Sequence, residues 1–340
     1  MSTIKKTLAI ETSCDDTSIG IISYNGETFS VDQIVAYSQI EHEKYGGVVP
    51  EFAYRLHSEK IIALLGKIGK ENIKQVDNIS VTTHPGLPGA LVIGKTVATM
   101  LSQYYQKPLI EVNHIHGHLL SIFLERKLSE IKFPIVVLSV SGWHNDLYLL
   151  EKKSEKNNFL VFDDISITKL GSTLDDAAGE SFDKVARMLG GPYPWGKRIS
   201  DLATLWKINP EISFKRIFLK SDEFNFSFSG MKAQVHFLLE NYKEKKIPLT
   251  DKLKADIAYE FQEAVVETLA KKLLKAALAH EVKTIALVGW VSANDRLISY
   301  TTDLKNQKWL AEIPLLTPTK KLYCTDNSAM IGVVWLLRGE

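Results

Sequence analysis

The stretch TLAIETSCDDTSIGIISY, residues 7–24, decides the fold because it joins two apolar segments through a short polar turn. Leu8–Ile10 and Ser18–Tyr24 have the composition of strands, and Ser13–Asp16 between them is typical of a tight turn. Asn25-Gly26 follows directly, and this dipeptide favours a hairpin turn. The chain is therefore predicted to open with a strand, a polar turn and a second strand.

The same pattern recurs in the middle of the chain. An apolar strand is expected at Pro134–Val140, a polar turn at Ser141–Asp146 and a returning strand at Leu147–Leu150. This weak internal repeat predicts two domains of similar fold. Elsewhere predicted helices alternate with predicted strands, which is typical of an α/β protein. The helices are expected at residues 49–65, 90–105, 252–280 and 326–337 and within 175–239, and the further strands at 79–83, 109–112 and 284–288.

Charged residues interrupt the apolar pattern between Arg126 and Phe133, and we place a domain boundary there. The first domain is predicted over residues 1–130, and the second, with a helical insertion, over residues 131–325. Residues 326–340 are expected to form a closing helix that packs back on the first domain. Asp326 is predicted to be the N-cap of this helix.

Composition sets only broad limits on function. The apolar fraction of 45% and the charged fraction of 24% are ordinary for a globular protein. A net charge of +1 neither indicates nor excludes a nucleic-acid partner, because a local basic patch would suffice. Cys14 and Cys324 lie far apart in sequence and form no disulfide framework, which favours a cytoplasmic location. No apolar run reaches the ~18 residues of a membrane span, so no membrane association is expected.

The segment VNHIHGH, residues 112–118, contains the first candidate for chemistry. His114 and His118 are four residues apart, so on a helix both imidazoles point the same way and can bind one metal ion. A carboxylate from elsewhere in the chain would complete the site. Two alternatives remain open: both histidines are surface or hydrogen-bonded residues, or His114 pairs with His116 on an extended segment.

Polar turns at strand ends supply further candidates. Asp15 and Asp16 lie in the first such turn, where acidic side chains either complete the turn or orient a reacting group. Gly289 follows a predicted buried strand, where a flat ligand can approach the backbone, and Asn294 lies shortly after it. The charged run at Lys243–Lys246 is interpreted as a solvated connection, with contact to tRNA as the alternative.

Several ordered motifs together resemble one protein family over nearly the whole chain. The family is TsaD, the tRNA N6-adenosine threonylcarbamoyltransferases, in its bacterial form. The motifs are LAIETSCDDT at residues 8–17, GGVVPE at 46–51, PGL at 85–87, the His114/His118 pair, DDAAGE and FDK at 175–180 and 182–184, FSFSG at 226–230, SAN at 292–294 and TDN at 325–327.

The resemblance implies both a fold and a reaction. The fold would be two related α/β domains of the actin-like, sugar-kinase and Hsp70 type, which are ribonuclease H-like, with an interdomain cleft. The enzyme would transfer the threonylcarbamoyl group from threonylcarbamoyl-AMP to N6 of adenosine 37 in tRNAs that read A-starting codons, and AMP would leave. Its partners would be tRNA and the TsaB-like and TsaE-like proteins, with TsaC making the intermediate.

The resemblance also assigns roles to residues. His114, His118 and Asp326 would bind one divalent metal ion, iron or zinc, with magnesium as an alternative. The adenylate would be held by Ser139, Val140, Ser141, Gly142, Trp143, Asp183, Gly196 and Asn294. Asp15 and Asp16 would be catalytic. Asp16 stands where the family usually has Glu, so its carboxylate is displaced by about one C–C bond from a position that would help to orient or deprotonate the amine.

Three tryptophans stand where the family has glycine, namely Trp143, Trp195 and Trp290. All three belong to loops that line the adenylate site in the family. A tryptophan at positive φ costs ~1–2 kcal/mol, and its indole occupies roughly 200 Å² of surface. We hypothesise that the tryptophans block or reshape nucleotide binding. In the alternative, the indoles turn outward or stack on adenine and activity is intact.

Two other functions are alternatives to the transferase: a scaffold protein and a metallopeptidase. The tryptophans favour a catalytically weakened scaffold of the same complex, whereas the intact His114, His118 and Asp326 argue against complete loss of a site. The His-x-x-x-His spacing also occurs in metallopeptidases. Ile115 stands directly after His114, where a zinc peptidase has its catalytic Glu, and this argues against peptidase chemistry.

Overall fold

A computed structural model of the chain describes residues 4–142, 144–153, 162–191, 195–205, 209–217, 223–307 and 310–337, with the backbone alone for 195–197. The chain divides into two compact units. The first consists of Met1–Phe133, Glu151–Ser166 and Leu316–Glu340, and the second of Pro134–Leu150 and Ile167–Leu315. The domain boundaries predicted at residues 130 and 325, and the predicted cleft, stay predictions.

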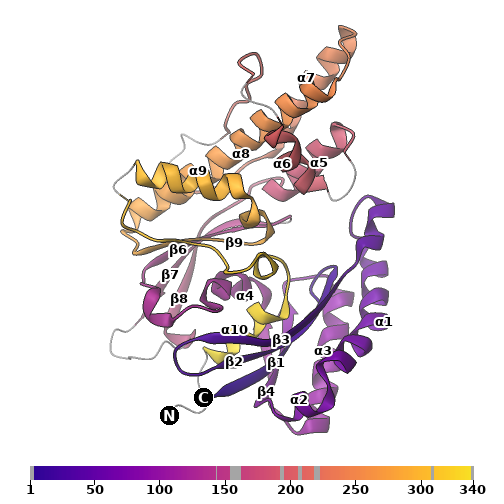
Figure 1. The fold of residues 1–340 in the computed structure, drawn as a ribbon, viewed down its shortest axis with the longest axis vertical. Coiled ribbons are helices and arrows are strands. Elements are labelled where there is room, and N and C mark those ends of the chain that lie inside the picture. The colour runs from indigo at the N-terminus through magenta and orange to yellow at the C-terminus, as the bar shows by residue number, and fades with distance from the viewer. Residues whose placement is uncertain are drawn as a thin grey trace. The chain divides into compact units, whose positions relative to one another are not determined.

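The first unit contains a five-stranded sheet in the order β3-β2-β1-β4-β5 (Figure 1). The central strand β1 pairs antiparallel with β2 and parallel with β4, which confirms the predicted strand, turn and strand at the start of the chain. Strand β3 was not predicted, because polar side chains interrupt its apolar pattern. The strands are β1 (Lys5–Glu11), β2 (Asp16–Tyr24), β3 (Phe29–Ser38), β4 (Asn78–His84) and β5 (Leu109–Asn113).

Helices of the first unit pack on both faces of this sheet. Alternate residues of β2 point to opposite faces. Ile19 and Ile21 join Ile61 of α1 in one core cluster, whereas a Cβ atom at Gly20 would lie 2.8 Å from Ser328 Oγ at the start of α10. The helices are α1 (Pro50–Ile68), α2 (Lys70–Lys74), α3 (Pro88–Tyr105), α4 (His114–Leu120) and α10 (Ser328–Leu336). The helices predicted at residues 49–65 and 90–105 are confirmed as α1 and α3.

The closing helix α10 is confirmed, but the prediction that Asp326 is its N-cap is wrong. Asn327 is the N-cap, and its side chain accepts a hydrogen bond from the Met330 amide. Its Nδ2 also donates to the carbonyls of Thr325 and Leu322, at 2.7 and 3.3 Å. Both residues are good N-caps by type, so composition alone did not distinguish them. The Asp326 carboxylate is consequently free to contact residues outside the helix.

The second unit repeats the strand order of the first. Its sheet runs β10-β9-β6-β7-β8, in which the central strand β6 pairs antiparallel with β7 and parallel with β9. The matching orders confirm the prediction of two related α/β domains. Strands β8 and β10 were not predicted. The strands are β6 (Ile135–Val140), β7 (Asn145–Lys152), β8 (Ile165–Ser172), β9 (Thr284–Val288) and β10 (Leu315–Leu316).

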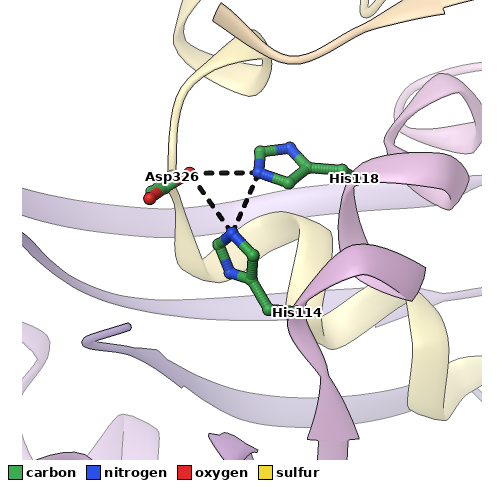
Figure 2. A group of neighbouring side chains, drawn as sticks. All are labelled: His114, His118 and Asp326. Atoms are coloured by element: carbon green, nitrogen blue, oxygen red, sulfur yellow. Dashed lines mark hydrogen bonds and ion pairs between the residues drawn. The ribbon is translucent and has the colours of Figure 1, made fainter. Parts of the chain in front are cut away.

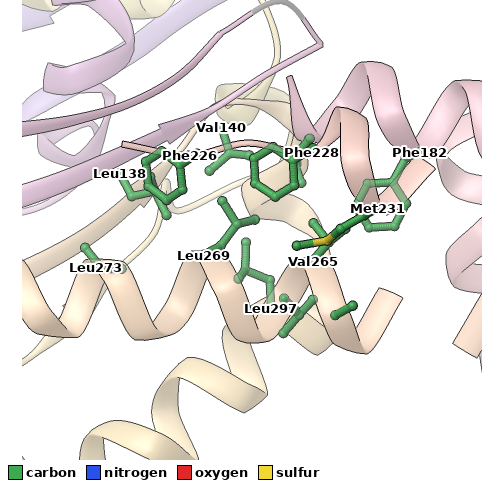
Figure 3. Packing of buried hydrophobic residues seen from close by; sticks show 14 of the residues in the cluster. Leu138, Val140, Phe182, Phe226, Phe228, Met231, Val265, Leu269, Leu273 and Leu297 are labelled. Carbon is green, nitrogen blue, oxygen red and sulfur yellow. The ribbon is translucent and has the colours of Figure 1, made fainter. Parts of the chain in front are cut away.

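The core of the second unit surrounds its longest helix, α8 (Figure 3). Leu138 and Val140 of β6 and the rings of Phe226 and Phe228 pack over Leu269 of α8. The helices are α5 (Ala178–Met188), α6 (Trp195–Thr204), α7 (Ser229–Glu244), α8 (Asp251–Ala279) and α9 (Asp295–Asn306). Among the described residues, no helix is both long and apolar enough to cross a bilayer.

Candidate functional site

Helix α4 carries the two predicted histidines in the first unit. Asn113, the last residue of β5, caps α4, because its side chain accepts hydrogen bonds from the amides of Ile115 and His116 at 2.8 and 3.3 Å. The cap fixes the first helical turn, so His114 and His118 lie on one face as predicted. The ring of His116 lies against Phe162 instead, with centroids 5.3 Å apart. The alternative pairing of His114 with His116 on an extended segment is therefore wrong.

Asp326 meets both histidines, although it is more than 200 residues away in sequence (Figure 2). Its Oδ1 lies 3.0 Å from His118 Nε2 and 3.6 Å from His114 Nε2. The two Nε2 atoms are 3.1 Å apart. Three potential ligand atoms thus form a small triangle, and the histidines are the more buried members.

This triangle has the dimensions of a metal site. Ligand atoms bound at ~2.0–2.2 Å around a tetrahedral ion lie about 3.3–3.6 Å apart. The three observed separations, 3.0 to 3.6 Å, are close to that value. When both imidazoles carry their proton on Nδ1, each of the three atoms has a lone pair available to a metal. The donor set of two imidazoles and one carboxylate therefore fits a single divalent ion.

Glu11 fixes the orientation of the first histidine. Its Oε2 lies 3.2 Å from His114 Nδ1, and Ser13 Oγ lies 3.1 Å from the same nitrogen. The Glu11 side chain is wholly buried, and it also accepts hydrogen bonds from the Ser13 amide, at 2.5 Å, and from the Thr82 hydroxyl. A carboxylate in this position holds the imidazole proton on Nδ1 and leaves Nε2 available to a metal.

Glu11 was not predicted to be a site residue. The available signal was a charged residue at the end of an otherwise apolar strand, directly before the polar turn. A charge that is buried at such a place requires a partner. Its partner is 103 residues away, so no local pattern indicates the pairing.

Charges at the centre affect one another strongly. Burial by itself would raise the pKa of Asp326, but the neighbouring His114 and His118 lower it to about 2. Burial by itself would lower the pKa of His114, but the carboxylates of Asp326 and Glu11 raise it to about 9. The surrounding carboxylates thus favour a positive charge at this point, which a divalent cation would supply.

The turn with Asp15 and Asp16 lies near the same centre. Burial and, to a smaller extent, the charges of Asp15 and Asp326 raise the pKa of Asp16 to about 8. A hydrogen bond from Ser38 Oγ acts in the opposite direction and lowers this pKa. Burial also raises the pKa of Asp15, and the charge of Asp326 adds to this increase. The first unit therefore brings both aspartates within electrostatic reach of a proposed metal ligand.

The predicted adenylate residues belong to the second unit. Ser139 and Val140 are buried in β6, and the backbone turns after them. Ser141 closes this turn, because its amide donates to the His144 carbonyl at 2.9 Å and its hydroxyl accepts from the His144 amide at 3.0 Å. The Gly179 amide, in the first turn of α5, donates to the Ser141 carbonyl at 3.3 Å.

Asn294 uses its whole side chain in structural hydrogen bonds. Its oxygen caps α9 by accepting from the amides of Arg296 and Leu297, at 2.9 and 3.1 Å. Its amide nitrogen donates to Ser200 Oγ at 3.0 Å and to Gln262 Oε1 at 3.1 Å. A polar contact from this side chain to a ligand would therefore have to replace one of these bonds.

Trp290 lies against the turn at Gly142. A Cβ atom at Gly142 would be 3.4 Å from the indole nitrogen, and one at Gly179 would be 2.9 Å from the indole ring. The positive φ, +84°, belongs to Gly289, and Trp290 begins a short 3₁₀ helix. Among the described non-glycine residues, positive φ occurs at Gln106, Glu125, Lys246 and Glu281. The expected strain of a tryptophan at positive φ is therefore wrong for Trp290, whose indole lies beside Gly142 and Gly179.

The remaining predicted residues are Trp143, Trp195, Gly196 and Asp183. Trp143 lies outside the described residues. Trp195 and Gly196 form the start of α6, where the backbone is helical. Asp183 lies half-buried on α5.

Two units with the same strand order, one carrying a His-His-Asp centre, define a two-domain α/β protein of the actin-like type with a candidate metal site. The chain belongs to the TsaD family, the tRNA N6-adenosine threonylcarbamoyltransferases, whose family model matches residues 31–333. It is 40% identical to the tRNA N6-adenosine threonylcarbamoyltransferase of Staphylococcus aureus (strain Newman), over 96% of this chain and 89% of that protein.

Solved structures support the fold. The crystal structure of T. kodakarensis HypF matches with a TM-score of 0.57 at 13% identity, over 99% of this chain and 47% of that one. A full-length HypF in a phosphate- and nucleotide-bound form also gives a TM-score of 0.57 at 13% identity, over 98% of this chain and 55% of that one. The chain thus spans about half the length of these HypF chains, and the likeness concerns the fold alone.

Proposed function

We propose that this chain transfers the threonylcarbamoyl group of threonylcarbamoyl-AMP to N6 of adenosine 37 in tRNAs that read A-starting codons. Membership of the TsaD family supports the reaction class. The observation that carries the proposal is the triangle of His114, His118 and Asp326, because it provides three convergent ligand atoms in a buried setting.

The reaction forms one bond and breaks another. The N6 amine attacks the carbamoyl carbon, a C–N bond forms, and the C–O bond to the phosphate of AMP breaks. The amine loses one proton and AMP leaves with the bonding electron pair. The exocyclic amine is a weak nucleophile, so the site must hold it at attack distance and accept its proton.

Asp16 and Asp15 are proposed to orient the amine and to accept that proton. A carboxylate whose pKa lies near neutrality is a suitable base. Burial and the charge of Asp15 raise the pKa of Asp16 toward that range, together with the charge of Asp326. A cation bound at the centre would offset the effect of the Asp326 charge on the pKa of Asp16. Burial and the charge of Asp15 would still raise that pKa.

His114, His118 and Asp326 are proposed to hold one divalent ion. Imidazole nitrogens favour iron or zinc over magnesium, which prefers oxygen ligands. When bound, the ion would act as a Lewis acid on the carbamoyl oxygen or would hold the phosphate. Glu11 would keep His114 in the tautomer that presents Nε2 to the ion.

The adenylate is proposed to bind at Ser139, Val140, Ser141, Gly142, Trp143, Asp183, Gly196 and Asn294. The hydrogen bonds of Ser141 and Asn294 support a role in shaping the backbone of these loops. The second candidate function is that of a catalytically weakened scaffold in the same complex. The specific observation in its favour is the indole of Trp290 against Gly142 and Gly179.

Partners and location follow from the family resemblance. We propose that TsaB-like and TsaE-like proteins act with this chain, and that it works in the cytoplasm without a membrane.

The test is transfer of the threonylcarbamoyl group to an unmodified tRNA in the presence of threonylcarbamoyl-AMP and matched partner proteins. The modified nucleoside should form in tRNA with adenosine at position 37 and not in the same tRNA with guanosine there. His118→Ala should abolish formation, and His236→Ala, at an exposed histidine of α7, should not. Absence of product with the wild-type chain and recovery in the Trp143→Gly/Trp195→Gly/Trp290→Gly form would favour the weakened scaffold.

A further inference from the structure

His57 of α1 lies beneath the turn that carries Asp15 and Asp16. Its side chain has no exposed surface. Its Nε2 is 2.9 Å from the Cys14 carbonyl and its Nδ1 is 2.7 Å from the Thr17 hydroxyl. One imidazole therefore contacts the residue before the aspartate pair and the residue after it.

These two contacts fix the tautomer of His57. A carbonyl oxygen can only accept, so Nε2 must carry a proton and donate it to Cys14. Burial lowers the pKa of His57, which favours the neutral imidazole. Nδ1 of the neutral ring then accepts from the Thr17 hydroxyl. Both ring nitrogens are thus satisfied, with opposite roles at the two ends of the turn.

The turn is also held from the 3₁₀ helix at Ile40–Tyr45 and the residues before it. The Gln39 amide donates to the Asp15 carbonyl at 3.2 Å. The side-chain oxygen of Gln39 lies 2.9 Å from Nε2 of buried His42, and the side-chain nitrogen of Gln39 donates to the Ala53 carbonyl of α1 at 3.2 Å. Ser38 Oγ donates to Asp16 Oδ1. The Asp15 backbone is therefore held by Gln39, which is itself bonded to α1, and the Asp16 carboxylate is held by Ser38.

We infer that His57 is a positioning residue for Asp15 and Asp16, and that it sets the geometry with which they address the substrate amine. The inference rests on the proposed function, in which these aspartates act on that amine. Within the described part of the chain, His57 is hydrogen-bonded to Cys14 and Thr17 and to none of the three proposed metal ligands, so its effect should be separable from metal binding. A displacement of about 1 Å in a catalytic group can reduce the rate about 100-fold.

The test uses His57→Gln, His57→Leu and Thr17→Val in the full chain with its partner proteins. Leucine removes both polar contacts. Glutamine restores a donor near the position of Nε2 but offers no equivalent of Nδ1. We expect His57→Leu to lower kcat 10- to 100-fold with KM for threonylcarbamoyl-AMP within twofold and with metal content unchanged. His57→Gln should recover part of the loss, and Thr17→Val should reduce kcat in the wild-type background but not further in His57→Gln.

Controls separate positioning from stability and from the proposed function. His236→Leu, at an exposed histidine, should leave kcat unchanged. If His57→Gln and Thr17→Val lower the melting temperature while kcat stays within twofold of wild type, His57 is a packing residue and the inference is overturned. Asp15→Asn and Asp16→Asn are measured in the same assay. Wild-type kcat in both would overturn the catalytic role of the aspartates and this inference together, whereas loss in the aspartate variants alone would overturn only this inference.

Discussion

Glu11 Oε2 lies 3.2 Å from His114 Nδ1, in a contact where the glutamate side chain has no exposed surface. Both Glu11 oxygens accept further hydrogen bonds, one from the Ser13 amide and the other from the Thr82 hydroxyl. The carboxylate is therefore a fixed acceptor that holds the proposed ligand His114 in one tautomer.

Glu11→Gln should weaken metal binding about 10- to 100-fold, in the range typical of partners behind metal ligands. The NH₂ group of the new glutamine must face either the Ser13 amide or the pair Thr82 and His114. Both places already hold hydrogen-bond donors, so one donor would face another. The measurement is competition for Zn²⁺ or Fe²⁺ against a chromophoric chelator. Glu71→Gln, at an exposed glutamate of α2, is the matched control. Equal affinity in Glu11→Gln and wild type would contradict the assigned role.

Metal affinity should depend on pH through His114. In the metal-free protein the carboxylates of Asp326 and Glu11 raise the pKa of His114 to about 9. A metal must displace the proton from Nε2, so the apparent affinity should rise about tenfold per pH unit up to about 9 and then level off. The check is calorimetric titration at several pH values. A flat affinity between pH 6.5 and 9 would contradict the account.

The stability of the metal-free protein should change over the same window. His114 has a higher pKa in the folded chain than its ordinary 6.5, so its contribution is fully present below pH 6.5 and is lost as pH rises through about 9. Metal-free protein should therefore unfold at lower temperature at pH 9 than at pH 6.5. Protein with metal bound should show a smaller change, because the ion replaces the proton.

Trp290→Gly should tighten binding of threonylcarbamoyl-AMP about tenfold, because the indole occupies space beside Gly142 and Gly179. The half-buried indole also packs on the core of the second unit, so the free energy of unfolding should fall by about 1–3 kcal/mol. Calorimetric titration measures the first effect and denaturant unfolding the second. Trp335→Phe, in α10, is the control. Unchanged or weaker binding in Trp290→Gly would mean that the indole is accommodated or stacks on the adenine.

Asn327→Ala should remove the cap of α10 and lower the free energy of unfolding by about 1–2 kcal/mol. The Met330 amide, which donates to Asn327 Oδ1 at 3.2 Å, should lose protection in hydrogen exchange. Asn306→Ala at the exposed end of α9 is the control for stability. Loss of Met330 protection in Asp326→Ala rather than in Asn327→Ala would restore the original cap assignment.

Local patterns predicted two related α/β domains and half of the proposed centre, but they missed strands β3, β8 and β10, and the actin-like type came from the family resemblance. The i, i+4 spacing of His114 and His118 was sufficient because Asn113 caps the helix that displays them. Asp326 could be assigned only through the family resemblance, and Glu11 was missed, because both contacts join residues more than 100 positions apart. The strain expected at Trp290 was wrong because the positive φ belongs to its neighbour Gly289. Spacing identifies residues that share an element, whereas the pairing of elements depends on the whole sheet.

The most direct test of the proposed metal-assisted transfer is the rate of threonylcarbamoyl transfer to tRNA as metal is returned to metal-free protein. Partner proteins, threonylcarbamoyl-AMP and unmodified tRNA are held constant, and Asp326→Asn is run in parallel. We expect no transfer without metal, a rate that rises until one equivalent per chain is bound, and at least a 100-fold lower rate in Asp326→Asn. Full transfer by the metal-free chain, or a wild-type rate in Asp326→Asn, would contradict metal-assisted transfer.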